Sequence, residues 1–134
     1  MDKRVVITGA GVVHSLGTDV KEFWENIKAG KSGISKIENF DAEDFPSQIA
    51  AEMKDFDPGE YIDRKEAKRL ALYSQYAIVS AMKAVEDAEL EITEENADRA
   101  GVIVGSGIGG IEVFEEQVTK MNKRGPRRVS PFFI

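Results

Sequence analysis

The stretch Val102-Ile-Val-Gly-Ser-Gly-Ile-Gly-Gly-Ile111 decides the fold, because an apolar run enters a glycine-rich turn and an amphipathic segment follows. A β-branched run of this length is typical of a buried strand, and the apolar spacing over 111–121 is typical of a helix. Glycines between the two allow positive φ or close approach to a ligand. We expect a strand over 100–104, a turn over 105–110 and a helix whose inward residues are Ile111, Phe114, Val118 and Met121.

This turn also has the spacing of a dinucleotide-binding fingerprint, with glycine at positions 105, 107 and 110. Such a site needs an acidic residue roughly 20 positions further on to hold the ribose hydroxyls. Residues 123–128 read Lys-Arg-Gly-Pro-Arg-Arg, so that acid is missing, and the earlier Gly9-Ala-Gly11 is only a partial match. We therefore expect no cofactor and keep a dinucleotide-binding oxidoreductase as the least favoured function.

A second β-branched run covers 4–8 and also ends at glycine. The two runs predict two strands, with one further short strand near 49–53 in an otherwise irregular stretch over 31–63. Helical segments accompany them, so the expected class is α/β. A two-stranded sheet is thin for such a domain, and the apolar end Val129-Ser-Pro-Phe-Phe-Ile134 is unusual for a domain terminus. We expect a fragment of something larger.

Two more helices are predicted. Thr18 resembles an N-cap and Gly30 a C′ residue, which bounds a helix over 19–29. Its inward residues are expected to be Val20, Phe23, Trp24 and Ile27. Over 64–89, small and apolar residues recur at helical spacing. The many alanines of this long helix would let it pack tightly against a sheet or a second helix.

The size and composition indicate one globular domain of 134 residues, with 42% hydrophobic and 31% charged residues. The absence of cysteine removes disulfides, thiolate metal sites and a cysteine nucleophile, and a single histidine removes most metal cages. No signal peptide or membrane-spanning stretch is visible, so we expect a cytoplasmic location and no membrane partner. The net charge of −6 argues against nucleic-acid binding.

Positive charge is nevertheless concentrated in two places. Arg64, Lys65, Lys68 and Arg69 form one basic cluster. Lys120, Lys123, Arg124, Arg127 and Arg128 form a second. Such clusters are commonly solvated surface. The alternative is a local landing site for an acidic partner, attracted by the patch rather than by the total charge.

Candidates for acid–base or nucleophilic chemistry are weak. His14 stands beside Ser15, but adjacent side chains rarely face each other and no third orienting group is evident, so we expect a loop histidine satisfied by backbone. Ser106 lacks the Gly-x-Ser-x-Gly elbow of hydrolases and is expected to serve the turn. We assign no catalytic or metal-binding residue.

Eight segments occur in the order and spacing of the condensing enzymes of fatty acid synthesis. They are Arg4-Val-Val-Ile-Thr-Gly-Ala-Gly11, Leu16-Gly17, Gly30-Lys-Ser-Gly-Ile34, Lys54-Asp-Phe-Asp57, Asp63-Arg-Lys-Glu66, Gln75-Tyr-Ala77, Gly105-Ser-Gly-Ile-Gly-Gly110 and Gly125-Pro-Arg-Arg-Val-Ser-Pro-Phe-Phe-Ile134. The whole chain, residues 1–134, resembles the N-terminal part of the N-terminal domain of a bacterial beta-ketoacyl synthase.

The resemblance implies a partial thiolase-like fold, of which this chain holds the start of the first α/β half. Family members are homodimers that elongate acyl chains by decarboxylative condensation of acyl and malonyl carrier-protein thioesters. Their nucleophilic cysteine, two histidines and a lysine correspond to positions beyond residue 134. The resemblance therefore implies that this chain alone is inactive, and that its partners are acyl carrier protein and an acyl chain.

The resemblance also assigns binding roles. Ile108 matches the bulky gate of the acyl pocket, and Phe133 and Ile134 match residues of the dimer interface near that pocket. Arg64, Lys65, Lys68, Arg69, Arg127 and Arg128 resemble the basic surface that meets the carrier protein. That likeness favours the landing-site interpretation of the basic clusters.

Two local departures from the family pattern stand out. His14-Ser15 replaces the usual Thr-Pro or Ser-Pro, which removes the fixed φ of proline from the loop. Leu70-Ala-Leu-Tyr73 replaces a more usual Met-Asp-Arg-Phe. A non-catalytic chain-length partner subunit, which would lack the nucleophile, is the alternative function within this resemblance.

Overall fold

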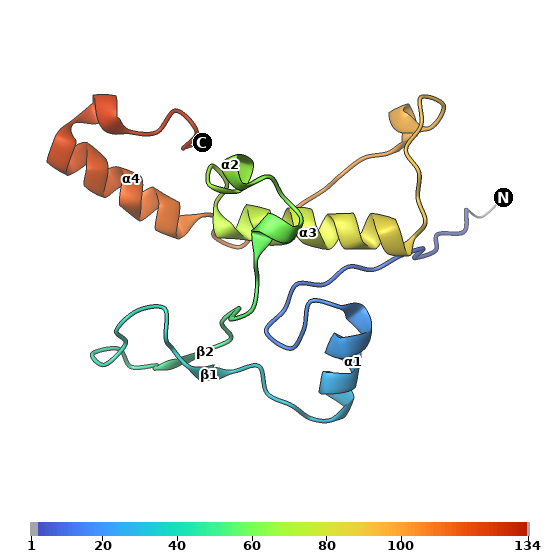
Figure 1. Ribbon diagram of the computed structural model, residues 1–134, viewed down its shortest axis with the longest axis horizontal. Coiled ribbons are helices and arrows are strands. Elements are labelled where there is room, and N and C mark those ends of the chain that lie inside the picture. Colours follow the sequence, from blue (N-terminus) through green and yellow to red (C-terminus); the bar gives the residue numbers. More distant parts are fainter. Residues whose placement is uncertain (1–2, 134) are drawn as a thin grey trace. The chain divides into compact units, whose positions relative to one another are not determined.

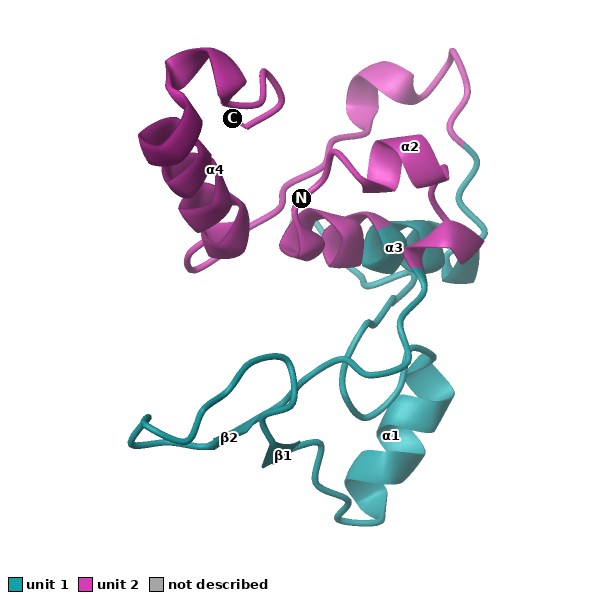
Figure 2. Ribbon diagram, turned by 60° about the vertical axis from the view of Figure 1, so that its left-hand side comes forward, with its two compact units in different colours: residues 1–57, 79–91 teal, residues 58–78, 92–134 magenta. Residues whose placement is uncertain are grey.

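The computed structural model describes residues 3–133 (Figure 1). Its helices are α1 (Val20–Lys28), α2 (Arg64–Ala67), α3 (Leu72–Asp87) and α4 (Ile111–Arg124), with the 3-10 turns η1 (Pro58–Glu60), η2 (Ala97–Arg99) and η3 (Pro126–Arg128). The strands are β1 (Ser35–Lys36) and β2 (Ile49–Ala50). The chain divides into two compact units (Figure 2): unit 1 is Met1–Asp57 with Val79–Glu91, and unit 2 is Pro58–Ile78 with Ile92–Ile134.

The sheet is smaller than predicted and lies elsewhere in the chain. β1 and β2 pair antiparallel, so the short strand expected near 49–53 is confirmed over two residues. The strands expected over 4–8 and 100–104 are wrong, because both segments run without regular secondary structure. A strand needs a neighbour to accept and donate its backbone hydrogen bonds. No described segment pairs with either run.

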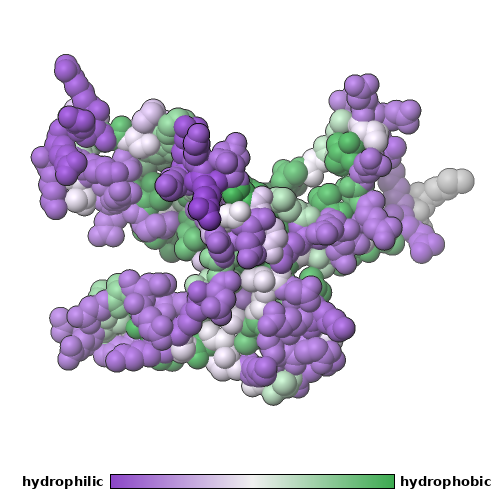
Figure 3. All heavy atoms as spheres, viewed as in Figure 1, coloured by the Kyte–Doolittle hydropathy of each residue, from purple (hydrophilic) through white to green (hydrophobic). Residues whose placement is uncertain are grey.

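The two unpaired runs expose their apolar side chains. Val5 is 93% exposed and Ile103 is 99% exposed. Figure 3 shows hydrophobic residues reaching the surface among the hydrophilic ones. Helices and a small sheet are both present, so the α/β class stands. A run of β-branched residues does not form a strand without a neighbouring strand to pair with.

The N-terminus of α1 is capped one residue later than predicted. The Asp19 carboxylate, not the Thr18 hydroxyl, accepts hydrogen bonds from the backbone N–H groups of Lys21 (2.9 Å) and Glu22 (3.1 Å). A carboxylate satisfies these free donors and also interacts favourably with the positive end of the helix dipole. The correction moves the start of the helix to Val20.

The C-terminus of α1 ends as predicted. Gly30 has a φ of 66°, and its N–H donates to the Ile27 carbonyl while the N–H of Lys31 donates to Asn26. This pair of bonds is the Schellman motif, which needs a left-handed residue at the C′ position. The predicted burial of this helix is mostly wrong, since Trp24 is 56% exposed.

The single long helix predicted over 64–89 is divided into α2 and α3. The side-chain amide of Gln75 donates from Nε2 to the carbonyls of Ala67 (2.9 Å) and Leu70 (3.0 Å), both of which lie at the break. Carbonyls at a helix end lack an intrahelical partner. Gln75 supplies one, so the break is a stabilised feature of unit 2.

The alanines of α3 do allow tight packing, but the segment that lies on them is irregular and is neither the sheet nor the second helix that the sequence predicts. In unit 1 the backbone of Gly9 and Gly11 lies directly on α3. A Cβ at Gly9 would come within 2.4 Å of the Ala84 carbonyl oxygen, and one at Gly11 within 2.0 Å of the Ser80 oxygen. The N–H of Ala10 between them donates to the Asp87 carboxylate at 2.8 Å. Glycine is required here by close approach.

Full burial is confined to a few side chains. Among residues 3–133, the buried apolar ones are Ala42, Ile62, Ala67 and Val79, and Val79 on α3 is the one at 0% exposure. None of the helices in this range is long and apolar enough to cross a bilayer. Most other large apolar side chains remain partly exposed.

Candidate functional site

The first basic cluster is displayed at the surface of unit 2 by α2 and the residues that follow it. Arg64 and Lys65 belong to α2, Lys68 is its C-cap and Arg69 comes next. The Asp63 carboxylate caps the helix by accepting from the N–H groups of residues 65 (2.8 Å) and 66 (3.3 Å). All four cations are exposed. Within residues 3–133 none of them forms an ion pair, so their charge is available to a partner.

In the second basic cluster, some of the positive charge is already paired within α4. Lys120 forms an ion pair with Glu116 one turn earlier on α4, at 2.6 Å. Lys123 and Arg124 lie in the last turn of α4, where positive charge interacts favourably with the negative end of the helix dipole. Arg127 and Arg128 belong to η3 and are exposed.

The two clusters are connected within unit 2 through an aromatic ring. The guanidinium carbon of Arg69 lies 4.6 Å from the centroid of the Phe132 ring. This distance is within the range of a cation–π interaction. Phe132 follows η3 in the chain, so the contact ties the segment after α2 to the segment that carries Arg127 and Arg128.

Ile108 stands at the tip of the glycine-rich turn. The N–H of Gly109 donates to the Ser106 hydroxyl at 2.9 Å, which confirms that Ser106 serves the turn. Gly109 has a φ of 77°, a conformation that favours glycine. Gly110 lies against Ala71, the residue before α3. A Cβ at Gly110 would come within 2.6 Å of the Ala71 Cβ. Ile108 itself is 79% exposed, so the described part of the chain does not enclose it.

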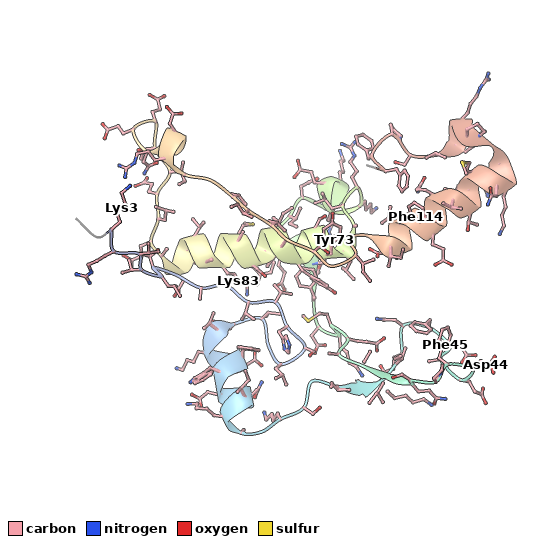
Figure 4. All side chains as sticks on the ribbon, turned by 180° about the vertical axis from the view of Figure 1, so that it is seen from behind. Lys3, Asp44, Phe45, Tyr73, Lys83 and Phe114 are labelled. Carbon is pink, nitrogen blue, oxygen red and sulfur yellow. The ribbon has the colours of Figure 1, made fainter. Side chains whose placement is uncertain are left out.

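Glu112 connects this turn to α3. Its Oε1 accepts a hydrogen bond from the N–H of Leu72 at 3.3 Å. Burial, with a smaller contribution from the negative charge of Glu112, raises the pKa of Tyr76. Tyr73, labelled in Figure 4, approaches both Gly109 and Gly110. The first turn of α3 therefore supports the base of the Ile108 turn.

Phe133 is half-buried against α4. Its ring centroid is 5.9 Å from that of Phe114, which Figure 4 labels on this helix. Ile134, the other residue expected beside the acyl pocket, lies outside the described residues. The structure therefore brings Phe133 to α4 and leaves Ile108 exposed, rather than enclosing both in one pocket.

The sequence interpretation missed Gln117. This residue is 4% exposed, and its Oε1 accepts a hydrogen bond from the N–H of Ser130 at 2.8 Å. Gln117 thereby holds the segment after η3 against α4. The sequence spacing could have indicated this burial, because position 117 is three residues after Phe114 and so lies on the same helix face. Ile111, Phe114 and Met121, expected on the inward face, are instead more than 40% exposed.

A separate hollow of about 440 Å³ lies within unit 1 and includes His14, Ser15, Gly33 and Lys54 in its lining. The Nδ1 of His14 accepts from the N–H of Leu16 at 3.1 Å, which confirms a loop histidine satisfied by backbone. A hydrogen bond to Glu38 raises the pKa of Lys54. The Ser15 hydroxyl is buried and has no hydrogen-bond partner among the described residues.

We predict that Ser15→Ala stabilises the protein. Removing a buried hydroxyl that lacks a partner should raise the free energy of unfolding by about 1 kcal/mol. Urea denaturation, followed through the fluorescence of Trp24, measures this. Ser32→Ala is the matched control, because the Ser32 hydroxyl accepts from the N–H of Ile34 at 3.1 Å and its loss should be destabilising. A lower stability of Ser15→Ala would contradict the prediction.

Comparison with known protein families identifies the family of this chain. The family model "Beta-ketoacyl synthase, N-terminal domain" matches residues 2–134. The chain belongs to the beta-ketoacyl synthase family. Its fold is accordingly a partial thiolase-like fold, and its α/β class is that of condensing enzymes.

Three similar proteins extend this result. A 3-oxoacyl-[acyl-carrier-protein] synthase 2 of Staphylococcus aureus (strain COL) is 51% identical over 133 residues, which are 99% of this chain and 32% of that protein. The ishigamide ketosynthase/chain length factor superposes with a TM-score of 0.75 at 32% identity, over 96% of this chain and 32% of that one.

The third is a ketosynthase structure described as a type II PKS acyl-carrier protein in complex with its ketosynthase bound to the hexaketide. It gives a TM-score of 0.78 at 25% identity, over 98% of this chain and 34% of that one. The chain thus spans about a third of the length of the relatives it matches.

Proposed function

We propose that this chain is the N-terminal part of a beta-ketoacyl synthase that elongates acyl chains, and that it provides the landing surface for acyl carrier protein. The observation that carries the proposal is the family match over residues 2–134. In the condensation the carbanion left when malonyl carrier protein loses carbon dioxide attacks an acyl thioester, so a carbon–carbon bond forms and the acyl carbon–sulfur bond breaks to release the thiol. The proposal includes a cytoplasmic, homodimeric parent enzyme, as the family resemblance implies.

The landing surface is formed by Arg64, Lys65, Lys68, Arg69, Arg127 and Arg128. Their exposure supports the role, and so does the absence of ion pairs to any of them among residues 3–133, because no bound carboxylate neutralises their charge. Charge complementarity of this kind accelerates encounter and fixes orientation more than it adds affinity. The ketosynthase structure that contains an acyl-carrier protein, similar to this chain at a TM-score of 0.78, adds support.

The acyl chain would meet Ile108, Phe133 and Ile134. Ile108 has the bulk for a gate and stands on a turn that contains four glycines, so its backbone can change conformation at low steric cost. Phe133 presents an aromatic ring packed on α4. Apolar walls of this type suit a hydrocarbon chain.

The covalent chemistry does not reside in these 134 residues. Taking up an acyl group as a thioester needs a thiol, and the sequence contains no cysteine. The single histidine, His14, uses its Nδ1 within its own loop. The residues of this chain bind and orient, while the groups that form and break bonds are supplied from elsewhere in the enzyme.

The test is a titration of acyl carrier protein into the chain at low and at moderate salt. Association should be weak and should decline as salt is added, because exposed charges are screened within about 10 Å at 0.1 M ionic strength. An unrelated acidic protein of equal net charge serves as the control. In the same samples malonyl and acyl carrier proteins should release no carbon dioxide. Binding that ignores salt, or turnover above the blank, would contradict the proposal.

A second candidate is a chain-length partner subunit without a nucleophile. The structural likeness to a protein described as a ketosynthase/chain length factor supports this candidate. Both candidates share the surface described above, so binding does not separate them. Sequencing the encoding gene beyond residue 134 does: a cysteine in a small-residue turn supports the synthase, and its replacement supports the partner subunit.

A further inference from the structure

Among residues 3–133, Arg69 is the member of the first basic cluster whose guanidinium lies over an aromatic ring. Its guanidinium carbon is 4.6 Å from the centroid of the Phe132 ring, and both residues belong to unit 2. Phe132 remains 55% exposed, so the ring is not part of a core. What sets Phe132 apart is the guanidinium that lies over its ring beside a basic cluster.

The ring is attached to a segment that is itself held in place. The N–H of Phe132 donates to the Ser130 hydroxyl at 3.1 Å. The N–H of Ser130 donates to Gln117 on α4 at 2.8 Å, and the following Phe133 contacts Phe114. Three anchors therefore surround Phe132 in the chain. Its ring can act as a platform rather than as part of a loose tail.

A platform matters for an arginine because its long side chain samples many rotamers in water. Ordering such a side chain on binding costs conformational entropy, which weakens the affinity. A side chain that is already held in place before binding loses less entropy. A guanidinium over an aromatic face keeps N–H donors for a carboxylate, since the cation–π interaction uses the ring face and not those hydrogen bonds.

We propose that Phe132 is a positioning residue for carrier-protein docking: its ring holds the Arg69 guanidinium ready for a carboxylate of the carrier protein. This inference rests on the proposed function and adds to the landing surface a residue with no charge. It also makes residues 126–132 contribute twice to the landing surface, directly through Arg127 and Arg128 in η3 and indirectly through the Phe132 ring that holds Arg69.

The experiment is a double-mutant cycle read as the dissociation constant for acyl carrier protein at low salt. Phe132→Leu removes the aromatic face but keeps an apolar side chain, and should weaken binding by about three- to tenfold. Phe132→Tyr keeps the face and should bind like the unchanged chain. In an Arg69→Ala background, Phe132→Leu should have no further effect, because no guanidinium remains to be positioned.

The outcomes separate positioning from a structural role. Unchanged binding by Phe132→Leu would overturn the inference. An equal loss in the Arg69→Ala background would overturn it too, because the ring would then act on something other than Arg69. Circular dichroism of all five proteins checks that helix content is preserved. If the unchanged chain does not bind carrier protein at all, the proposed function fails, and the inference fails with it.

Discussion

Replacing Lys65 and Arg69 together by glutamate should weaken association with acyl carrier protein by at least about tenfold at low salt. Two attractive charges on one side of the landing surface become repulsive, and a tenfold change corresponds to about 1.4 kcal/mol. Neither cation forms an ion pair within the described residues, so neither substitution breaks a salt bridge of the folded chain. Calorimetric titration of the carrier protein measures the effect.

The matched control for this pair is Lys21→Glu with Lys36→Glu. Both lysines are exposed in unit 1, and either pair of substitutions changes the net charge from −6 by −4, to −10. Total charge is thus equal in the two variants while the location differs. The control should bind nearly as the unchanged chain does. Equal losses in the two variants would show that net charge, not the cluster after Asp63, determines association.

Gly11→Ala should cost about 2–3 kcal/mol of unfolding free energy. A Cβ at this position would come within 2.0 Å of the Ser80 carbonyl oxygen and 2.7 Å of the Ala84 backbone nitrogen. Both atoms belong to the backbone of α3, so no side-chain rotation can relieve the overlap, and overpacking of this type costs a few kcal/mol. Urea denaturation followed by Trp24 fluorescence reports on the same unit.

Gly101→Ala is the control for this substitution. Gly101 has no positive φ, and nothing lies within 4 Å of where its Cβ would be, so alanine should be tolerated there. A Gly11→Ala protein that unfolds at the same urea concentration as Gly101→Ala would show that the segment over 9–11 does not rest on α3.

Local signals in the sequence predicted the C-terminal end of α1 and two loop contacts correctly, although they placed the N-cap of α1 at Thr18 instead of Asp19. Gly30 is at the left-handed C′ position of α1 because only a residue without a Cβ adopts that conformation cheaply. Ser106 bonds within its own turn and His14 within its own loop, since both partners are only two or three residues away. Such features depend on chemistry between near neighbours, which the sequence displays directly.

Features that depend on distant neighbours were predicted less well. The runs over 4–8 and 100–104 have strand composition but no partner, so they form no ladder. The helix predicted over 64–89 is divided, and the side chains of Gln75 and Glu112 supply hydrogen bonds to backbone groups at the break, which the sequence pattern does not display. Apolar spacing predicted the inward face of α4, but the buried residue of this helix is Gln117. Its hydrogen-bond partner, Ser130, belongs to the segment that follows η3.

The sequence by itself determined the family, the cap glycine Gly30, the basic clusters and the absence of a thiol, because these depend on residue type and order. Tertiary structure alone decided that Gly9 and Gly11 are needed against α3, that Gln117 anchors the segment after η3, and that Phe132 lies under Arg69. The reason is physical: contact energies depend on distances between residues far apart in the chain, and only folding fixes those distances.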